Sequence, residues 1–191
     1  MQHETIELEH WTIEIHRDDD PLDPRKEYDN VGTMVCFHSR CALGDDHEFT
    51  PESAREFIEE QGDNILWLPL YLYDHSGITI SAAPFSCPWD SGQIGFIYCT
   101  QEQINHEWNG DRDAARKYLL AEVSTYDQYL TGDIWGFVVK DEHEEIVDSC
   151  WGFYGYEYCV EEARDSAQHS LEIAHAAYHK EAIAEILATV C

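Results

Sequence analysis

Carboxylates far outnumber basic side chains in this chain, and they are spread along its whole length. The 191 residues include 39 Asp and Glu against 11 Lys and Arg, which gives a formal net charge of -28. Any fold must therefore place carboxylates on most of its solvent-facing surface and bury enough apolar area to offset their repulsion. Hydrophobic residues make up 43% and aromatic residues 13%, so we expect a folded globular protein rather than a disordered acidic tail.

The same charge argues against several classes of partner. A nucleic-acid binder needs a basic face, and an anionic membrane attracts basic segments, so we expect neither direct nucleic-acid binding nor membrane binding. The longest apolar stretch, residues 65–73, is too short to span a bilayer and contains Pro69. No signal-peptide pattern opens the chain and its 7 cysteines are an odd number, so we expect mostly buried free thiols in a cytoplasmic protein.

Hydrophobic periodicity predicts an α+β fold, with a mainly antiparallel sheet, flanking helices and a long C-terminal helix. Residues 5–9 and 11–15 alternate as one bulged edge strand or two short strands, and residues 17–30 are expected as an acidic loop. Further strands are expected at 31–38, 65–73, 78–81, 94–99, 134–139 and 146–153. Helices are expected at 50–62, 100–108, 114–130 and 160–190. We expect residues 1–159 to form one domain, with 160–191 as a helical segment packed on it.

Two details of this pattern bear on the packing. Trp135 and Trp151 lie symmetrically about His143, so a turn centred there would pair the two indoles across neighbouring strands. The apolar stripe predicted for helix 114–130 includes one carboxylate, Glu122.

The densest group of potentially catalytic residues lies in the two segments 70–78 and 85–93. Asp74, His75, Cys87 and Asp90 are residue types that build a nucleophilic site, in which an acid orients a base beside a thiol or hydroxyl. Asp, Ser, Gly and Pro are also what tight turns require. Turn architecture is the favoured interpretation, and catalysis is the alternative.

Metal-ligand residues gather in one further segment. Cys36, His38, Cys41 and His47 could bind zinc if the strand folded back near Arg40, but no Cys-x-x-Cys motif accompanies them. A second set shares one face of the C-terminal helix, without the second helix that a di-metal bundle needs. Its members are Glu172, His175 and His179. We expect no metal and no cofactor, because no phosphate-binding or dinucleotide motif is present either.

The acidic clusters are the candidate binding residues. They are Asp18, Asp19, Asp20, Asp45, Asp46, Asp141, Glu142, Glu144 and Glu145. Such carboxylates can imitate the phosphates of nucleic acid and occupy a basic channel, or they can reflect adaptation to high salt. Both interpretations fit the sequence.

Four sequence strings resemble a family of small proteins carried by bacteriophages, prophages and plasmids. The strings are NVGTMVCFH at 30–38, YDHSGI at 73–78, FSCPWDSGQIG at 85–95 and DSCWGFYG at 148–155. The resemblance implies an anti-defence role, such as blocking a restriction or CRISPR nuclease in the host cytoplasm, and it supplies no catalytic residues. Our leading hypothesis is therefore a non-enzymatic inhibitor that binds the basic surface of a host nuclease or defence complex. The alternatives are a small hydrolytic or metal-dependent enzyme and a salt-adapted protein with no charged partner.

Overall fold

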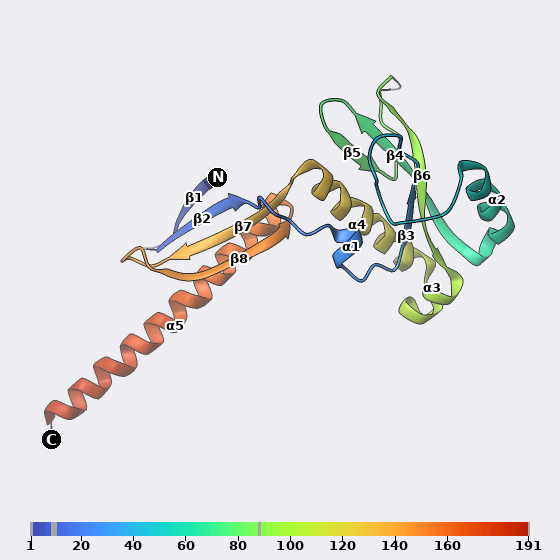
Figure 1. The fold of residues 1–191 in the computed structure, drawn as a ribbon. Coiled ribbons are helices and arrows are strands. Elements are labelled where there is room, and N and C mark those ends of the chain that lie inside the picture. Colours follow the sequence, from blue (N-terminus) through green and yellow to red (C-terminus); the bar gives the residue numbers. More distant parts are fainter. Residues whose placement is uncertain (1, 9–10, 88, 191) are drawn as a thin grey trace. The chain divides into compact units, whose positions relative to one another are not determined.

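The computed structural model describes residues 2–8, 11–87 and 89–190 (Figure 1). It divides into two compact units, and each unit contains its own four-stranded antiparallel sheet. Unit 1 comprises Met1–Pro21 and Asp133–Cys191, and unit 2 comprises Leu22–Gly132. The predicted α+β class is confirmed.

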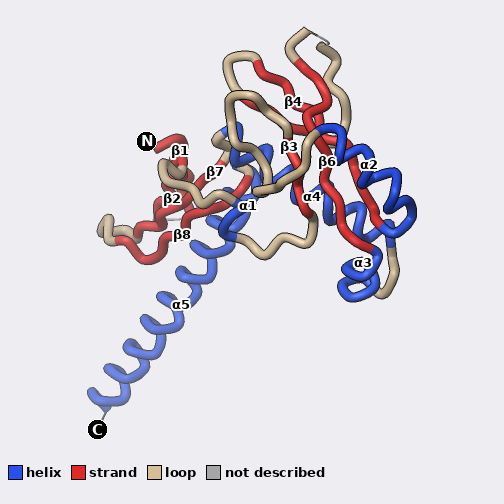
Figure 2. Tube along the Cα trace, turned by 45° about the vertical axis from the view of Figure 1, so that its right-hand side comes forward, coloured by secondary structure: helices blue, strands red, loops and turns tan. Residues whose placement is uncertain are grey.

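Unit 2 is built on a sheet with the strand order β3-β6-β4-β5. The strands are β3 (Thr33–Cys36), β4 (Ile65–Asp74), β5 (Ile78–Ser81) and β6 (Ser91–Thr100). The helices are α1 (Pro24–Glu27), α2 (Pro51–Gln61), the 3₁₀ turn η1 (Gly62–Asn64), α3 (Gln101–Trp108) and α4 (Arg112–Thr131). Figure 2 distinguishes these helices and strands by colour.

The two faces of this sheet bury different sets of side chains, because successive residues of a strand point to opposite faces. On one face, Leu119 and Tyr126 of α4 belong to a buried cluster with Ile97 of β6. On the other face, Ala54 of α2 is buried with the neighbouring β6 residue, Phe96. The sheet is therefore covered by helices on both faces along β6, its most extensively paired strand.

Helix ends in unit 2 follow the capping signals of the sequence. The Thr50 side chain caps α2 and forms a capping box with Ser53, and Thr100 and Gln103 form the same motif at α3. Asp111 caps α4, accepting bonds from two backbone N–H groups. These caps satisfy donors that have no partner inside the helix. They confirm the predicted helix starts near 50 and 100, whereas α4 begins two residues before the predicted start at 114.

Unit 1 is built on a sheet with the strand order β1-β2-β7-β8, which pairs β2 with a strand more than 100 residues away in the sequence. Its elements are β1 (Gln2–Leu8), β2 (Trp11–Arg17), β7 (Ile134–Lys140), β8 (Ile146–Tyr154) and α5 (Tyr156–Val190). Buried residues at every fourth position place the first half of α5 against one face of the sheet. They are Cys159, Ala163, Ala167 and Leu171. Residues 172–180, further along the helix, are exposed.

The predicted pairing of Trp135 with Trp151 is wrong, and a β-bulge is the reason. Lys140 lies opposite Ile146 and Val139 lies opposite Asp148, so Val147 is an extra residue of β8, and it shifts Trp151 to a position opposite Gly136. Trp135 lies opposite Phe153, so β8 carries a second extra residue between these last two pairs. That residue is Gly152, whose φ of 85° lies in the left-handed region. Trp135 therefore lies in the core, where it is 3% exposed, and Trp151 lies on the opposite face with Gly136, where it is 48% exposed.

Three other expectations differ from the structure. The expected acidic loop 17–30 contains the helical turn α1, and the C-terminal helix begins at Tyr156 instead of 160. The compact units divide at 21/22 and 132/133, whereas the expected boundary near 159 falls inside α5. The β2–β7 pairing accounts for the difference, because it joins both ends of the chain in one sheet.

Candidate functional site

The four residues proposed for a nucleophilic site do come together, at the end of β4 and the start of β6. The backbone N–H of Asp74 donates to the carbonyl oxygen of Asp90 over 2.9 Å. Nδ1 of His75 lies 3.4 Å from Oδ2 of Asp90, and the Cys87 thiol lies 3.8 Å from the same oxygen. The sequence thus identified a real spatial cluster.

The order of groups in this cluster differs from that of a nucleophilic site. A thiol nucleophile needs a base beside it and an acid beyond the base, whereas here the Asp90 carboxylate lies between the thiol and the imidazole. The Asp74 carboxylate is paired with the guanidinium of Arg40. Ser76 has a φ of 62°, a turn conformation. The geometry supports two loops tied together by polar contacts.

The proposed zinc ligands do not converge on one point. Nε2 of His47 lies 3.0 Å from the carbonyl oxygen of Cys36, not from its thiol. Nδ1 of His38 accepts the backbone N–H of Cys41 over 3.1 Å. Burial raises the pKa of the Cys36 thiol to about 12, which disfavours the thiolate that zinc requires. Across the described residues, no three His, Cys, Asp or Glu side chains form a group that could hold a metal ion.

A buried ion network in unit 2 is the main polar feature that sequence reasoning missed. The Arg25 side chain is 1% exposed, and its Nη1 donates to Oε2 of Glu122 over 2.7 Å. Its Nη2 donates to Oδ2 of Asp45 and to the carbonyl oxygen of Gly32, each over 2.6 Å. Burial disfavours the charged guanidinium, but the bonds to Asp45 and Glu122 outweigh burial, so the pKa of Arg25 is raised.

The Glu122 carboxylate also fixes the chain that leads into β3. Its Oε1 accepts the backbone N–H groups of Val31 and Gly32, over 2.9 and 3.0 Å. A Cβ at Gly32 would lie 2.9 Å from Oε2 of Glu122, so only glycine allows this close approach. The available sequence signal was a carboxylate on the apolar stripe of a helix, which indicates a buried partner.

The candidate acidic binding residues fall into three locations. Asp45 belongs to the buried network just described, so its charge is compensated by Arg25; this corrects its expected place on an acidic surface. Asp46 is exposed in unit 2. The other seven lie in unit 1, after β2 and in the β7–β8 turn. They are Asp18, Asp19, Asp20, Asp141, Glu142, Glu144 and Glu145.

Within these two acidic loops, the first carboxylate shapes the loop and the later ones face solvent. Oδ1 of Asp18 accepts the backbone N–H of Asp20 over 3.1 Å. Oδ1 of Asp141 accepts the backbone N–H groups of His143 and Glu145, over 2.8 and 3.0 Å. Asx turns of this kind hold the loop backbone in place. The carboxylates that follow are thereby presented on an ordered backbone.

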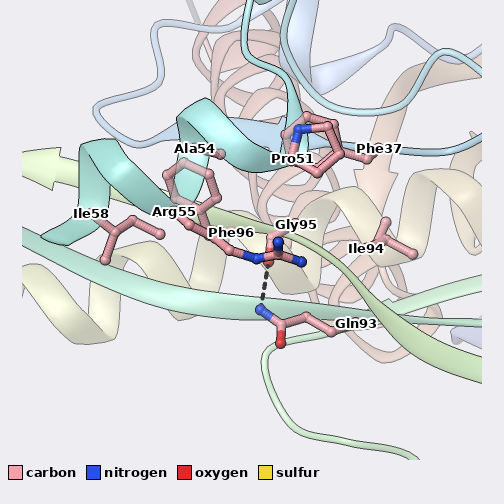
Figure 3. Close-up of a pocket in the computed structure, with 9 residues that line it drawn as sticks. All are labelled: Phe37, Pro51, Ala54, Arg55, Ile58, Gln93, Ile94, Gly95 and Phe96. Atoms are coloured by element: carbon pink, nitrogen blue, oxygen red, sulfur yellow. Dashed lines mark hydrogen bonds between the residues drawn. The ribbon is translucent and has the colours of Figure 1, made fainter.

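A hollow of about 330 Å³ lies between α2 and β6 in unit 2 (Figure 3). Its walls are mostly apolar, and its polar side chains are those of Arg55 and Gln93, with Gln93 Nε2 donating to the carbonyl oxygen of Gly95 over 3.4 Å. Its lining residues include no carboxylate, histidine or cysteine. The hollow therefore lacks the acid–base or nucleophilic pair that catalysis would need.

Comparison with known proteins found no matching family model, no matching curated protein and no matching solved structure. The resemblance to mobile-element proteins accordingly stays a prediction. Among the described residues, no helix is both long and apolar enough to cross a membrane.

Proposed function

We propose that the protein is a non-enzymatic binding protein whose unit 1 occupies a basic surface of a nucleic-acid-handling enzyme and inhibits it. The observation that carries this proposal is the uneven distribution of charge. Unit 1 contains 20 Asp and Glu and only 4 Lys and Arg, a formal charge of -16. The larger unit 2 contains 19 Asp and Glu and 7 Lys and Arg, a formal charge of -12.

The 4 cations of unit 1 are far outnumbered by its 20 carboxylates. Nζ of Lys140 is bonded to Oε1 of Glu14 over 2.7 Å. The guanidinium carbon of Arg17 lies 4.7 Å from the ring centre of Trp135, in a cation–π contact. Two of the four cations are thus engaged with side chains of the sheet.

The exposed face of α5 adds a row of carboxylates. Glu157, Glu161 and Asp165 are exposed and follow one another at intervals of four residues. At a rise of about 1.5 Å per residue, neighbouring carboxylates are about 6 Å apart along the helix. One strand of DNA carries a phosphate about every 3.4 Å along its axis. These three carboxylates therefore have roughly half that linear density, with the exposed Arg164 beside the last of them, and this spacing supports phosphate mimicry without base recognition.

The resemblance to mobile-element proteins supplies the proposed class of target. A restriction or CRISPR nuclease holds nucleic acid in a positively charged channel, and opposite charge accelerates association with such a surface. The proposed setting is the cytoplasm of the host cell. The partner is a protein, because 39 carboxylates would repel nucleic acid directly.

Two charge-neutralised variants test the proposal. The first replaces Asp19, Asp20, Glu142, Glu144 and Glu145 of unit 1 with the corresponding amides. The matched control neutralises an equal number of exposed carboxylates in unit 2. They are Glu52, Glu56, Glu59, Glu60 and Asp63. The assay is DNA cleavage by a panel of restriction and CRISPR nucleases with added protein, repeated at increasing salt.

We expect the natural chain to inhibit at least one nuclease, with weaker inhibition as salt rises. Neutralising unit 1 should abolish inhibition, and neutralising unit 2 should leave most of it. Equal losses in the two variants, or inhibition that is independent of salt, would contradict the assignment to unit 1. Unfolding of the natural chain when salt is removed would favour salt adaptation instead. Loss of inhibition in a folded Cys87→Ser variant would favour the enzyme alternative.

A further inference from the structure

We infer that Trp151 is the docking point for an arginine side chain of the basic partner, on the open face of the unit 1 sheet. This inference rests on the proposed function and names the contact that gives unit 1 its specificity. It depends on how three strands place their side chains on the face opposite α5.

The pairing register of β2, β7 and β8 defines which side chains lie on the open face of the sheet. The helix α5 packs on the face that contains Ile13, Ile15 and Phe137, so alternate residues of β2 and β7 point to the other side. One cross-strand row of that side contains His16, Gly136 and Trp151, which are paired in this order across β2, β7 and β8. The next row contains Glu14, Val138 and Ser149.

The Trp151 indole lies over Gly136. A Cβ at residue 136 would stand 2.3 Å from Cε3 and 2.4 Å from Cδ2 of the indole, so only glycine leaves room for the ring. The His16 ring flanks the indole, with a distance of 5.8 Å between ring centres. One side of the indole is therefore supported by the sheet while the residue stays 48% exposed, which leaves an aromatic platform open to solvent.

The platform has both charged and apolar neighbours, since the next row contains Glu14 and Val138. Glu14, in the neighbouring row, is bonded to Lys140, and this bond is the main reason why the pKa of Glu14 is lowered. The face ends at Arg17 on one side, where Asp18–Asp20 follow, and at Lys140 on the other, where the turn 141–145 follows. A central aromatic group between two acidic borders matches a basic segment lying across the sheet.

Arginine fits this arrangement better than lysine. A planar guanidinium can stack on an indole while its N–H groups reach carboxylates at the edges, whereas an ammonium is a compact and strongly hydrated charge. Tryptophan and arginine are also the side chains that most often dominate binding energy at interfaces. The occupant is therefore an arginine-bearing segment of a basic protein.

Two peptides of equal charge, octa-arginine and octa-lysine, separate this contact from general electrostatic attraction. Binding of each peptide to the full-length protein is measured by calorimetry at low salt. The variants are Trp151→Ala, Trp151→Leu and Gly136→Ala, with folding checked by circular dichroism. Trp89→Ala is the matched control, because Trp89 is 91% exposed on a loop of unit 2.

We expect the natural chain to bind octa-arginine more tightly than octa-lysine by about two- to fivefold. This is the affinity difference that corresponds to the free energy of one exposed cation–π contact. Trp151→Ala and Trp151→Leu should remove this preference and leave octa-lysine binding unchanged, and Trp89→Ala should preserve it. Gly136→Ala should reduce the preference by displacing the ring.

The possible failures are distinguishable. If both peptides bind with equal affinity and Trp151→Ala changes neither, the platform is refuted while the acidic binding surface stands. If neither peptide binds at low salt, the proposed function itself fails. If Trp151→Ala converts a dimer to a monomer in light scattering, the face is an interface between two copies and the inference is overturned.

Discussion

Replacing Glu122 should destabilise unit 2 more than replacing any other carboxylate of the ion network. Its side chain is 6% exposed, and its two oxygens serve the guanidinium of Arg25 and two backbone N–H groups. Glu122→Ala leaves the buried guanidinium of Arg25 with one partner fewer, and it leaves the backbone N–H groups of Val31 and Gly32 without an acceptor. Breaking a buried ion pair costs about 3–5 kcal/mol, and the unsatisfied N–H groups alone account for about 1–3 kcal/mol each.

Urea unfolding measures this loss. Since the urea dependence of a small domain is about 1–3 kcal/mol per molar, the midpoint for unit 2 should fall by at least about 1 M. Asp45→Ala should cost less, about 1–3 kcal/mol, because the Asp45 side chain is 23% exposed and water can replace part of its role. The control is Asp46→Ala, at an exposed neighbouring position. A loss in Glu122→Ala below about 1 kcal/mol, or equal to that of Asp46→Ala, would refute the reasoning.

Three further predictions concern unit 1. Gly152→Ala should reduce thermal stability by about 1–3 kcal/mol, since a φ of 85° is strained for any residue with a Cβ; an unchanged melting temperature would contradict the bulge. Burial raises the pKa of Cys159 to about 12, so very little of this thiol is ionised at pH 8. A thiol reagent followed by mass spectrometry should therefore label exposed Cys150 long before Cys159. Lys140 lowers the pKa of Glu14, so their bond stabilises the fold above the unfolded carboxyl pKa, and this stabilisation is lost as the pH falls through the lowered pKa of the folded state. In the Lys140→Met variant, the free energy of unfolding measured with urea should therefore lose this part of its pH dependence between about pH 5 and 3.

Local chemistry made much of unit 2 predictable. Helix starts follow from Thr50, Thr100 and Asp111, because caps are set by a few neighbouring residues. The strands of the central region follow from runs of apolar and aromatic residues between turn signals. The cluster around Asp90 could also be anticipated, since both of its segments were recognisable as turns next to strands.

The candidate sites could be anticipated only in part. The sequence placed seven of the acidic candidates in two loops, but it did not separate these loops from residues 22–132, which form the other unit. It treated Asp45 as a surface group, because nothing local reveals that Arg25 reaches it from 20 residues away. Long-range ion pairs depend on which elements pack together, and periodicity contains no information about that choice.

The sequence by itself therefore determined the α+β class, the helix caps, most strands and the acidic character of the surface, since each depends on residues close together in the chain. Tertiary structure alone decided the pairing of β2 with β7, the burial of Arg25 and the face on which Trp151 lies. The last of these turns on one residue. Side chains alternate with a period of two along a strand, so the single extra residue at Val147, between the pairs Lys140–Ile146 and Val139–Asp148, moves Trp151 from the expected pairing with Trp135 to the solvent face.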